Sequence, residues 1–318
     1  MSSQKQIREE ITAKIIEALE KGVRPWVRPW SISPNSGRPM NVVSHKLYQG
    51  INPLLLELHN LRFGLRSRHW GTFRQWSDLG CSVKKRPADV EPGHWAANII
   101  LYRPFKKTVE NDDGQEEEHE FMVMRTFSVF SADQVSGDAA EKFQVHDEPA
   151  TGIIMPDYRP AEELIAATGA DIRFGGDRAY YVRPLPDGSW PNHSDGDYIM
   201  LPPKHRYVKS GCYYDTLAHE LCHWSELRTG WDHSKEGYPA GEMAAEIGAT
   251  YLCSELGVPQ GEDLANHAAY LQSWLSAMKA DSSYIFRAAT QASKVTDYLL
   301  SFVRKPEAQP EPATAEAA

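Results

Sequence analysis

The 318-residue sequence contains few cysteines and no long apolar run, and both absences narrow its class. Its four cysteines form no Cys-x-x-Cys pair, which favours a reducing compartment over a disulfide-stabilised secreted fold. No apolar stretch approaches membrane-spanning length, and the first ten residues lack the hydrophobic core of a signal peptide. We therefore expect a cytoplasmic protein with no membrane partner. No helix-turn-helix, zinc-finger or RRM pattern appears either.

The charge is divided unevenly along the chain. The formal net charge is −9, yet residues 1–107 hold 18 of the 34 Lys and Arg against 8 of the 43 Asp and Glu. That segment carries a net charge of +10, and the remainder carries −19. Such a division indicates a basic module that binds a polyanion, followed by an acidic module with another task. An imbalance that serves only solubility is the alternative.

The segment from Thr216 to Trp224 contains His-Glu-x-x-His in a stretch that should be helical, because no Gly or Pro interrupts it. Residues i and i+4 share a helix face, so His219 and His223 can hold one metal ion between their imidazoles. Glu220 can act on a water molecule beside that ion without binding the ion itself. The pattern predicts a mononuclear site for Zn²⁺, which Mn²⁺ can share, with Glu220 as the catalytic residue.

A zinc ion of this kind needs a third protein ligand and leaves one position open. A metzincin would have Gly and His at positions 226 and 229, where this chain has Glu226 and Thr229, so that subclass is excluded. A second helical pattern places Glu242 and Glu246 on one face, so that one carboxylate can bind metal while the other orients a ligand histidine.

Two alternatives to this pair of carboxylates stay open. They could be solvated on an exposed helix face, although the Ala and Gly around them favour close helix packing. His233, in a loop rich in Gly and charge, competes as the third ligand. The order of the two acids resembles that of the gluzincins. The resemblance implies that Glu242 binds the metal and that Glu246 orients a ligand histidine without binding the metal itself.

The basic half interleaves Arg and Lys with aromatic residues. Residues 24–30 repeat Arg-Pro-Trp, and the prolines keep the backbone extended. This arrangement suits single-stranded nucleic acid, because guanidinium groups meet phosphates while indole faces stack on bases. Anchoring of the two Trp over the core is the alternative. The candidate DNA-binding residues are Arg24, Trp26, Arg28, Trp30, Tyr48, Asn52, Trp70, Arg74, Lys84, Lys85 and Arg86.

The periodicity predicts an α+β protein of two domains. Residues 1–137 form a small basic α+β module, 138–157 a linker, 158–304 the metal-site domain and 305–318 a disordered tail. In the first domain we expect helices over 4–21, 52–59 (with Asn52 as N-cap) and 72–79 (with Phe73 and Trp76 facing the core). Antiparallel strands are expected over 99–102 and 121–130, joined by an acidic exposed turn at 111–120. The second domain should hold a helix over 161–168, strands over 179–183 and 198–201, and helices over 263–279 and 282–302.

Several motifs spread over nearly the whole chain resemble one family. They are Pro25-Trp26 and the segments 48–52 (Tyr-Gln-Gly-Ile-Asn), 70–75 (Trp-Gly-Thr-Phe-Arg-Gln), 129–134, 175–181, 213–224, 242–252 and 270–275. They are similar to ArdC-type antirestriction proteins of conjugative plasmids, and more broadly to a metallopeptidase group of mobile elements and phages. The chain departs from the family pattern at Ser131, where Asn is common, and at 227–230, where the family is more basic.

The resemblance implies an N-terminal single-stranded DNA-binding domain and a C-terminal zincin-like (gluzincin) metallopeptidase domain, which together protect incoming DNA from restriction. The favoured hypothesis is a metalloendopeptidase that acts on restriction enzymes or other DNA-bound proteins. The alternative is a protein that coats single-stranded DNA and whose metal only braces the second domain. A peptidase with no DNA role is the third possibility, and it predicts no salt-dependent binding to single strands.

Overall fold

The computed structural model describes residues 4–24, 35, 37–110, 116–145, 158–185, 189–191, 196–207, 209–231, 236–259 and 268–304. Its N-terminal part contains α1 (Gln4–Glu20), β1 (Met40–Asn41), α2 (Asn52–Phe63), β2 (His69–Gly71), α3 (Phe73–Asp78), β3 (Ser82–Val83), β4 (Ala97–Glu110), β5 (Glu116–Ser131), β6 (Val135–Ser136) and α4 (Asp138–Glu141). The C-terminal part contains α5 (Arg159–Thr168), β7 (Ile172–Phe174), β8 (Tyr180–Val182), β9 (Tyr198–Leu201), α6 (Ser210–Glu226), α8 (Tyr238–Leu256), α9 (Ala268–Ala280) and α10 (Tyr284–Leu300). Within these ranges, no helix is both long and apolar enough to cross a bilayer.

The N-terminal part is built on a four-stranded sheet of order β1-β2-β5-β4. β4 and β5 form the antiparallel hairpin that the sequence predicts, and their pairing runs from Ala97 opposite Val129 to Glu110 opposite Glu116. The strands therefore extend into the stretch expected to be a turn, of which residues 111–115 lie outside the described residues. α2 packs on β4, and Ile100 and Met124 of the hairpin join Leu54 of α2 in the core.

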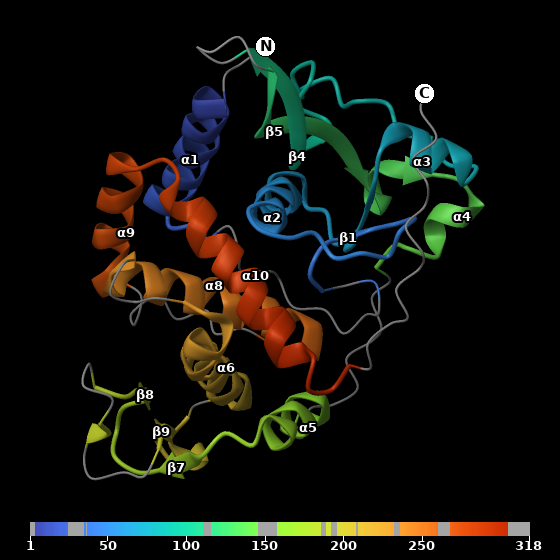
Figure 1. Ribbon diagram of the computed structural model, residues 1–318. Coiled ribbons are helices and arrows are strands. Elements are labelled where there is room, and N and C mark those ends of the chain that lie inside the picture. Colours follow the sequence, from blue (N-terminus) through green and yellow to red (C-terminus); the bar gives the residue numbers. More distant parts are fainter. Residues whose placement is uncertain are drawn as a thin grey trace.

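One hydrophobic core joins the two parts of the chain. It gathers Ile15 of α1 and Leu54 of α2 with Met243 of α8 and Ile285 of α10, each of them fully buried. In Figure 1, α8 and α10 cross the middle of the molecule, with the N-terminal sheet on one side and the small sheet of β7, β8 and β9 on the other. The helix that carries Glu242 is consequently packed from both sides.

The second core lies between α6, α8 and the three-stranded sheet of order β7-β9-β8. Leu217 and Leu221 of α6, which lie four residues apart and so share a helix face, pack there. α6 and α8 approach closely because Gly248 has no side chain. A Cβ at that position would stand 2.9 Å from the Cys222 sulfur. The two helices that carry the candidate metal ligands are thus held directly against each other.

Three details of the N-terminal part differ from the prediction. α2 begins at Asn52, with Ile51 as its N-cap, and the Asn52 carboxamide instead bonds the backbone of Ile100 through both of its polar atoms, at 2.8 and 2.7 Å. Phe73 does not face the core but is 63% exposed. The Thr72 hydroxyl caps the first turn of α3 and the buried side of that helix is occupied by Trp76, so Phe73 at its start points outward. Residues 138–141, expected within the linker, form α4.

Candidate metal centre

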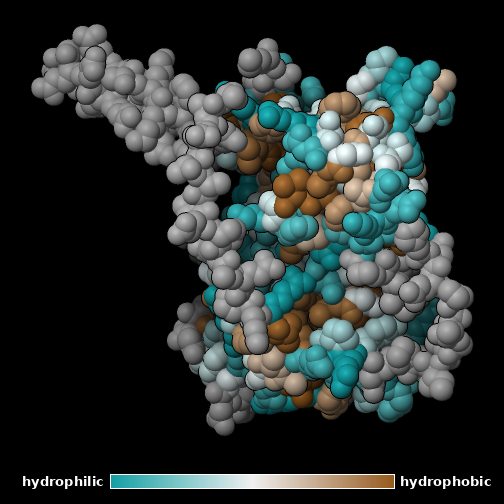
Figure 2. Space-filling model, turned by 90° about the vertical axis from the view of Figure 1, so that its right-hand side faces the viewer, coloured by the Kyte–Doolittle hydropathy of each residue, from teal (hydrophilic) through white to brown (hydrophobic). Residues whose placement is uncertain are grey.

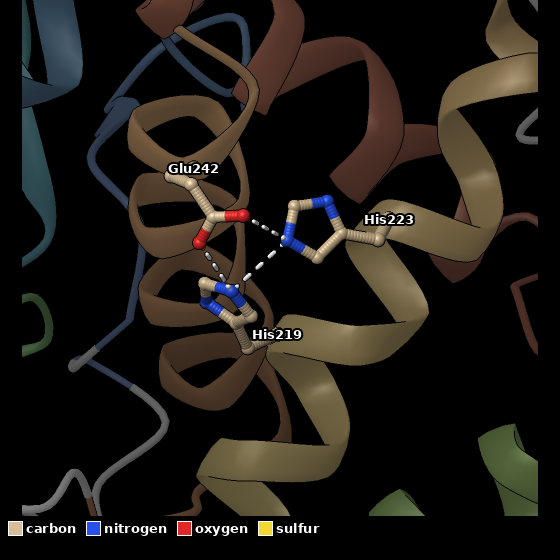
Figure 3. A group of neighbouring side chains, drawn as sticks. All are labelled: His219, His223 and Glu242. Atoms are coloured by element: carbon tan, nitrogen blue, oxygen red, sulfur yellow. Dashed lines mark hydrogen bonds and ion pairs between the residues drawn. The ribbon is translucent and has the colours of Figure 1, made fainter. Parts of the chain in front are cut away.

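Three side chains from two helices converge on one point. His219 and His223 lie one turn apart on α6, and Glu242 lies on the first turns of α8. The Nε2 atoms of the two histidines are 3.1 Å apart, and the two carboxylate oxygens of Glu242 lie 3.5 Å from His219 Nε2 and 3.4 Å from His223 Nε2. All three side chains point toward one another (Figure 3). The structure therefore brings together the three residues that the sequence predicts as metal ligands.

The dimensions of this triangle fit a divalent ion. A tetrahedral ion with bonds of about 2.0–2.1 Å holds its ligand atoms about 3.3–3.4 Å apart. The three observed separations of 3.1, 3.4 and 3.5 Å are close to that value, and the two that involve Glu242 are made by different oxygens of its carboxylate. With one donor atom from each residue, the three atoms lie within 4.8 Å of one another. The donor set is two imidazole nitrogens and one carboxylate, a combination that suits Zn²⁺ and also Mn²⁺. In the part of the chain that the structure describes, this is the one cluster of His, Cys, Asp and Glu with such spacing.

Each candidate ligand histidine faces a second carboxylate through its other ring nitrogen. Glu226 accepts from His223 Nδ1 at 2.8 Å, and Glu246 lies 3.8 Å from His219 Nδ1. Such contacts fix the tautomer and the orientation of a metal-binding imidazole. The sequence predicted this role for Glu246 but not for Glu226. The signal for Glu226 was its position three residues after His223 on the same helix, which places both side chains on one face.

The two orienting carboxylates each contact an arginine. Arg183, directly after β8, donates to Glu226 at 3.3 Å, and Arg24, from the N-terminal part, donates to Glu246 at 3.1 Å. The side chains of Arg24 and Glu246 are 10% and 8% exposed. Arg24 is thus committed to a buried ion pair rather than presented to solvent, although the sequence assigned it to DNA.

Mutual contacts outweigh burial in setting the protonation of the cluster. Burial alone would lower the pKa of His223, but its hydrogen bonds to Glu226 and Glu242 raise the pKa to about 10. Burial opposes ionisation of Glu242, yet the two imidazoles hold the pKa of its carboxyl well below the ordinary range. Because histidines bind metal in their neutral form, these contacts link the binding of an ion to pH.

Glu220 occupies the side of α6 that faces β8. Its side chain is buried, and the backbone N–H of Tyr181 on β8 donates to its carboxylate. Burial raises the pKa of Glu220, while the nearby histidines lower it. β8 lies at an edge of its sheet, with β9 as its one neighbour among the described strands, so this candidate base stands between the metal ligands and an edge strand.

The predicted DNA-binding residues fall into three groups. Trp26, Arg28 and Trp30 lie outside the described residues, as does His233, the rival third ligand. Arg74 and Lys85 are exposed, Lys84 is exposed and donates to the Asp133 carbonyl at 2.9 Å, and Arg86 is half-buried. Tyr48 and Asn52 are half-buried within the fold.

Trp70 differs from the prediction most clearly. It lies on β2, between β1 and β5, and is completely buried. The structure does not support it as a base-stacking residue, because neither face of its indole is open to a ligand.

Two family models match the chain. Residues 5–130 match the N-terminal domain of anti-restriction factor ArdC, and residues 159–291 match a zincin-like metallopeptidase. The chain therefore has an ArdC-type N-terminal domain and a zincin-like metallopeptidase domain, and the centre described above lies within the second. A zincin-like domain implies a divalent metal, and the geometry of the three ligands agrees with one.

Several known proteins resemble the chain over nearly its full length. Two solved structures of the antirestriction protein ArdC from plasmid R388 are similar. The metal-free form is 32% identical with a TM-score of 0.69, covering 93% of this chain and 97% of that one, and the Mn(II)-bound form is 30% identical with a TM-score of 0.65, covering 94% and 99%.

Curated relatives include the uncharacterized protein y4eC of Sinorhizobium fredii, 30% identical over 92% of this chain and 91% of the relative. Two DNA primases TraC of Escherichia coli are each 31% identical over 96% and 95% of this chain. The chain spans only 20% and 28% of the length of those two primases.

Proposed function

Because the chain belongs to the ArdC family of antirestriction proteins, we propose that it binds single-stranded DNA through its N-terminal part and hydrolyses peptide bonds at the centre formed by His219, His223 and Glu242. Its substrates are restriction enzymes or other proteins on the same DNA. The observation that carries the proposal is the donor triangle with 3.1–3.5 Å edges. This cluster of three ligands lies next to the buried Glu220 and to the edge strand β8.

The residues of the centre divide the work of hydrolysis. His219, His223 and Glu242 would hold a divalent ion, which would act as a Lewis acid and lower the pKa of bound water from about 16 to about 7. Glu220 takes the proton from the attacking water and passes it to the leaving amine. β8 pairs with the backbone of an extended peptide and so aligns the carbonyl beside Glu220. Glu226 and Glu246 keep the two imidazoles in the orientation that binds the ion.

The exposed residues of α3 and the loop after β3 provide the DNA-binding surface. Figure 2, turned toward the side of the molecule that carries α3 and α4, shows apolar patches in its upper and lower halves, interspersed with hydrophilic residues. Phe73 on α3 is the most exposed large apolar side chain among the described residues, and Arg74 follows it with 89% of its side chain exposed. With Lys84 and Lys85, they combine a stacking ring with phosphate-binding cations, as single-strand binders do. Tethering to DNA raises the local concentration of the peptidase near proteins on that strand.

The variant Glu220→Gln separates peptide hydrolysis from binding. It keeps the shape of the side chain and the metal ligands, so we expect normal Zn²⁺ content and normal affinity for a fluorescent single-stranded oligonucleotide. Cleavage of a protein bound to that oligonucleotide should fall by about 10²–10⁴-fold, because the general base is lost. Protection of a transferred plasmid in a restricting host should fall with it. Full protection by Glu220→Gln would instead establish the coating function, with the metal as a brace.

The DNA part of the proposal has its own test. Charge reversal at Lys85 should weaken binding to single strands and reduce the slope of log affinity against log salt by about 0.7 for each phosphate that the side chain no longer neutralises. Lys14, which is exposed on α1, serves as the matched control, and its reversal should leave that slope unchanged. Equal effects of the two reversals would show that general charge, and not this surface, attracts DNA.

A further inference from the structure

The first arginine of the Arg-Pro-Trp repeat reaches the metal centre. Arg24 Nη1 lies 3.1 Å from Glu246 Oε1, while Glu246 Oε2 lies 3.8 Å from His219 Nδ1. Arg24 and Glu246 are 222 residues apart in sequence, and the pair is almost fully buried. One chain of contacts therefore runs from the N-terminal part through Glu246 to a metal-binding imidazole.

The same arrangement occurs on the other histidine. Arg183 Nη2 lies 3.3 Å from Glu226 Oε2, and Glu226 Oε1 lies 2.8 Å from His223 Nδ1. Each ligand histidine is thus backed by a carboxylate and each carboxylate by an arginine. The two arginines come from different domains, since Arg183 belongs to the zincin-like domain and Arg24 to the N-terminal one.

The two arginines matter for the charge of the centre. Four carboxylates are each at most 7% exposed, namely Glu220, Glu226, Glu242 and Glu246. Metal-binding imidazoles are neutral, so a bound divalent ion together with the two guanidinium groups would offset these four negative charges among the described residues. Removing one arginine leaves a buried carboxylate undercompensated, and such a group protonates or turns away from its partner.

We propose that Arg24 is a positioning residue of the metal centre, through which the N-terminal domain completes a site whose ligands all lie in the other domain. Arg24 holds the Glu246 carboxylate in place, and the carboxylate holds the His219 ring with Nε2 aimed at the ion. The inference rests on the metal centre of the proposed function and not on peptide hydrolysis. It also removes Arg24 from the cations available to DNA.

A second buried ion pair provides a matched control. Arg68 donates to Glu255 at 2.7 Å, with side chains 14% and 2% exposed, and Glu255 lies on α8 like Glu246. This pair also connects the N-terminal domain to α8, but Glu255 forms no hydrogen bond or ion pair with His219, His223 or Glu242 among the described residues. If Arg24 served only to dock the two domains, the loss of either arginine would affect metal binding alike.

The experiment measures Zn²⁺ affinity of the full chain by competition with a chromophoric chelator. We expect Arg24→Ala to lower the affinity by up to about 10-fold, less than the about 10–100-fold expected on losing Glu246, the direct partner of the ligand histidine. Arg24→Lys, which retains the charge, should recover part of the loss and covers the case in which the alanine variant folds poorly. Arg68→Ala should lower the melting temperature of the metal-free protein while leaving Zn²⁺ affinity within about threefold of wild type.

A double-mutant cycle of Arg24→Ala and Glu246→Gln tests whether Arg24 affects Zn²⁺ affinity through Glu246. If Arg24 acts through Glu246, adding Arg24→Ala to Glu246→Gln should reduce the affinity by less than about threefold further. The visible spectrum of the Co²⁺-loaded protein should change in both single variants and stay unchanged in Arg68→Ala. Wild-type affinity in Arg24→Ala, equal losses in Arg24→Ala and Arg68→Ala, or independent losses in the cycle would each overturn the proposal. Glu220→Gln should retain wild-type Zn²⁺ affinity, so failure of the hydrolytic proposal is recognised separately.

Discussion

Gly248 controls the distance between the two helices that hold the candidate metal ligands. A Cβ added there would lie 2.9 Å from the Cys222 sulfur on α6 and 3.1 Å from Val295 Cγ2 on α10. Ordinary contacts of a Cβ begin at about 3.4 Å. Gly248→Ala must therefore push α8 away from α6 by several tenths of an ångström. Since Glu242 lies on α8 and both histidines lie on α6, the same movement widens the donor triangle.

The magnitude follows from two opposing effects. Overpacking of a close-packed core costs about 1–3 kcal/mol. Replacing Gly by Ala within a helix contributes about 1 kcal/mol of stability through helix propensity. The packing cost prevails because the buried Gly248 lies against Cys222 of α6 and Val295 of α10, so we expect a net loss of up to about 2 kcal/mol.

Thermal unfolding of the metal-free protein and a Zn²⁺ titration test this expectation together. Gly248→Ala should melt several degrees below the wild type and bind Zn²⁺ more weakly. Cys222→Ala removes the sulfur that the new methyl group meets, so the double variant should recover affinity relative to Gly248→Ala alone. A single variant that melts at or above the wild-type temperature would refute the packing argument, because propensity alone would then account for the effect.

Three further predictions concern the orienting carboxylate, the ion and the pH. Glu226→Gln should lower Zn²⁺ affinity by about 10–100-fold in a calorimetric titration, since His223 loses its anionic partner; unchanged affinity would contradict the role of Glu226. Chelation should lower the melting temperature, and free Zn²⁺ or Mn²⁺ at about 100 times its Kd should restore about 2.7 kcal/mol; an identical melting temperature with and without chelator would mean that no such ion binds. Burial, with Arg68 nearby, lowers the pKa of His69 to about 4, so its contribution of up to about 3 kcal/mol is complete above pH 6.5 and is lost as the pH falls toward 4. In denaturant titrations, His69→Asn should reduce the loss of unfolding free energy between pH 6.5 and pH 4. An unchanged loss would count against a buried neutral imidazole.

Local patterns predicted the elements that carry the centre. The His-Glu-x-x-His spacing requires a helix, and α6 runs through it from Ser210 to Glu226. The strand predicted over 198–201 has the same bounds as β9. Periodicity succeeds here because one face of each element packs on a core, and the residues of that face recur at the period of the element.

Long-range contacts were beyond such patterns. Asn52 was expected to cap its own helix, but its carboxamide pairs with the backbone of Ile100, 48 residues away. Arg24 was assigned to DNA by its Arg-Pro-Trp context, and its partner Glu246 lies 222 residues further along the chain. A local pattern indicates that a charge or an amide is present, but its partner is known only once the fold brings them together.

The two aromatic residues around Gly71 exchanged their expected positions. Trp70 was expected to stack on bases and is buried in a central strand, whereas Phe73 was expected in the core and is exposed. The strand and the helix follow each other closely, with Thr72 capping α3 between them. A shift of one residue in the start of such an element changes which side chain faces inward, and composition alone does not determine that start.

The central claim is that two imidazoles of α6 and one carboxylate of α8 grip a single divalent ion. Anomalous diffraction at the zinc edge, on crystals of the protein loaded with one equivalent of Zn²⁺, tests it most directly. We predict one peak, with His219 Nε2, His223 Nε2 and a Glu242 oxygen about 2.0–2.2 Å from it. A peak elsewhere, or an ion at this place without Glu242 among its ligands, would contradict the claim.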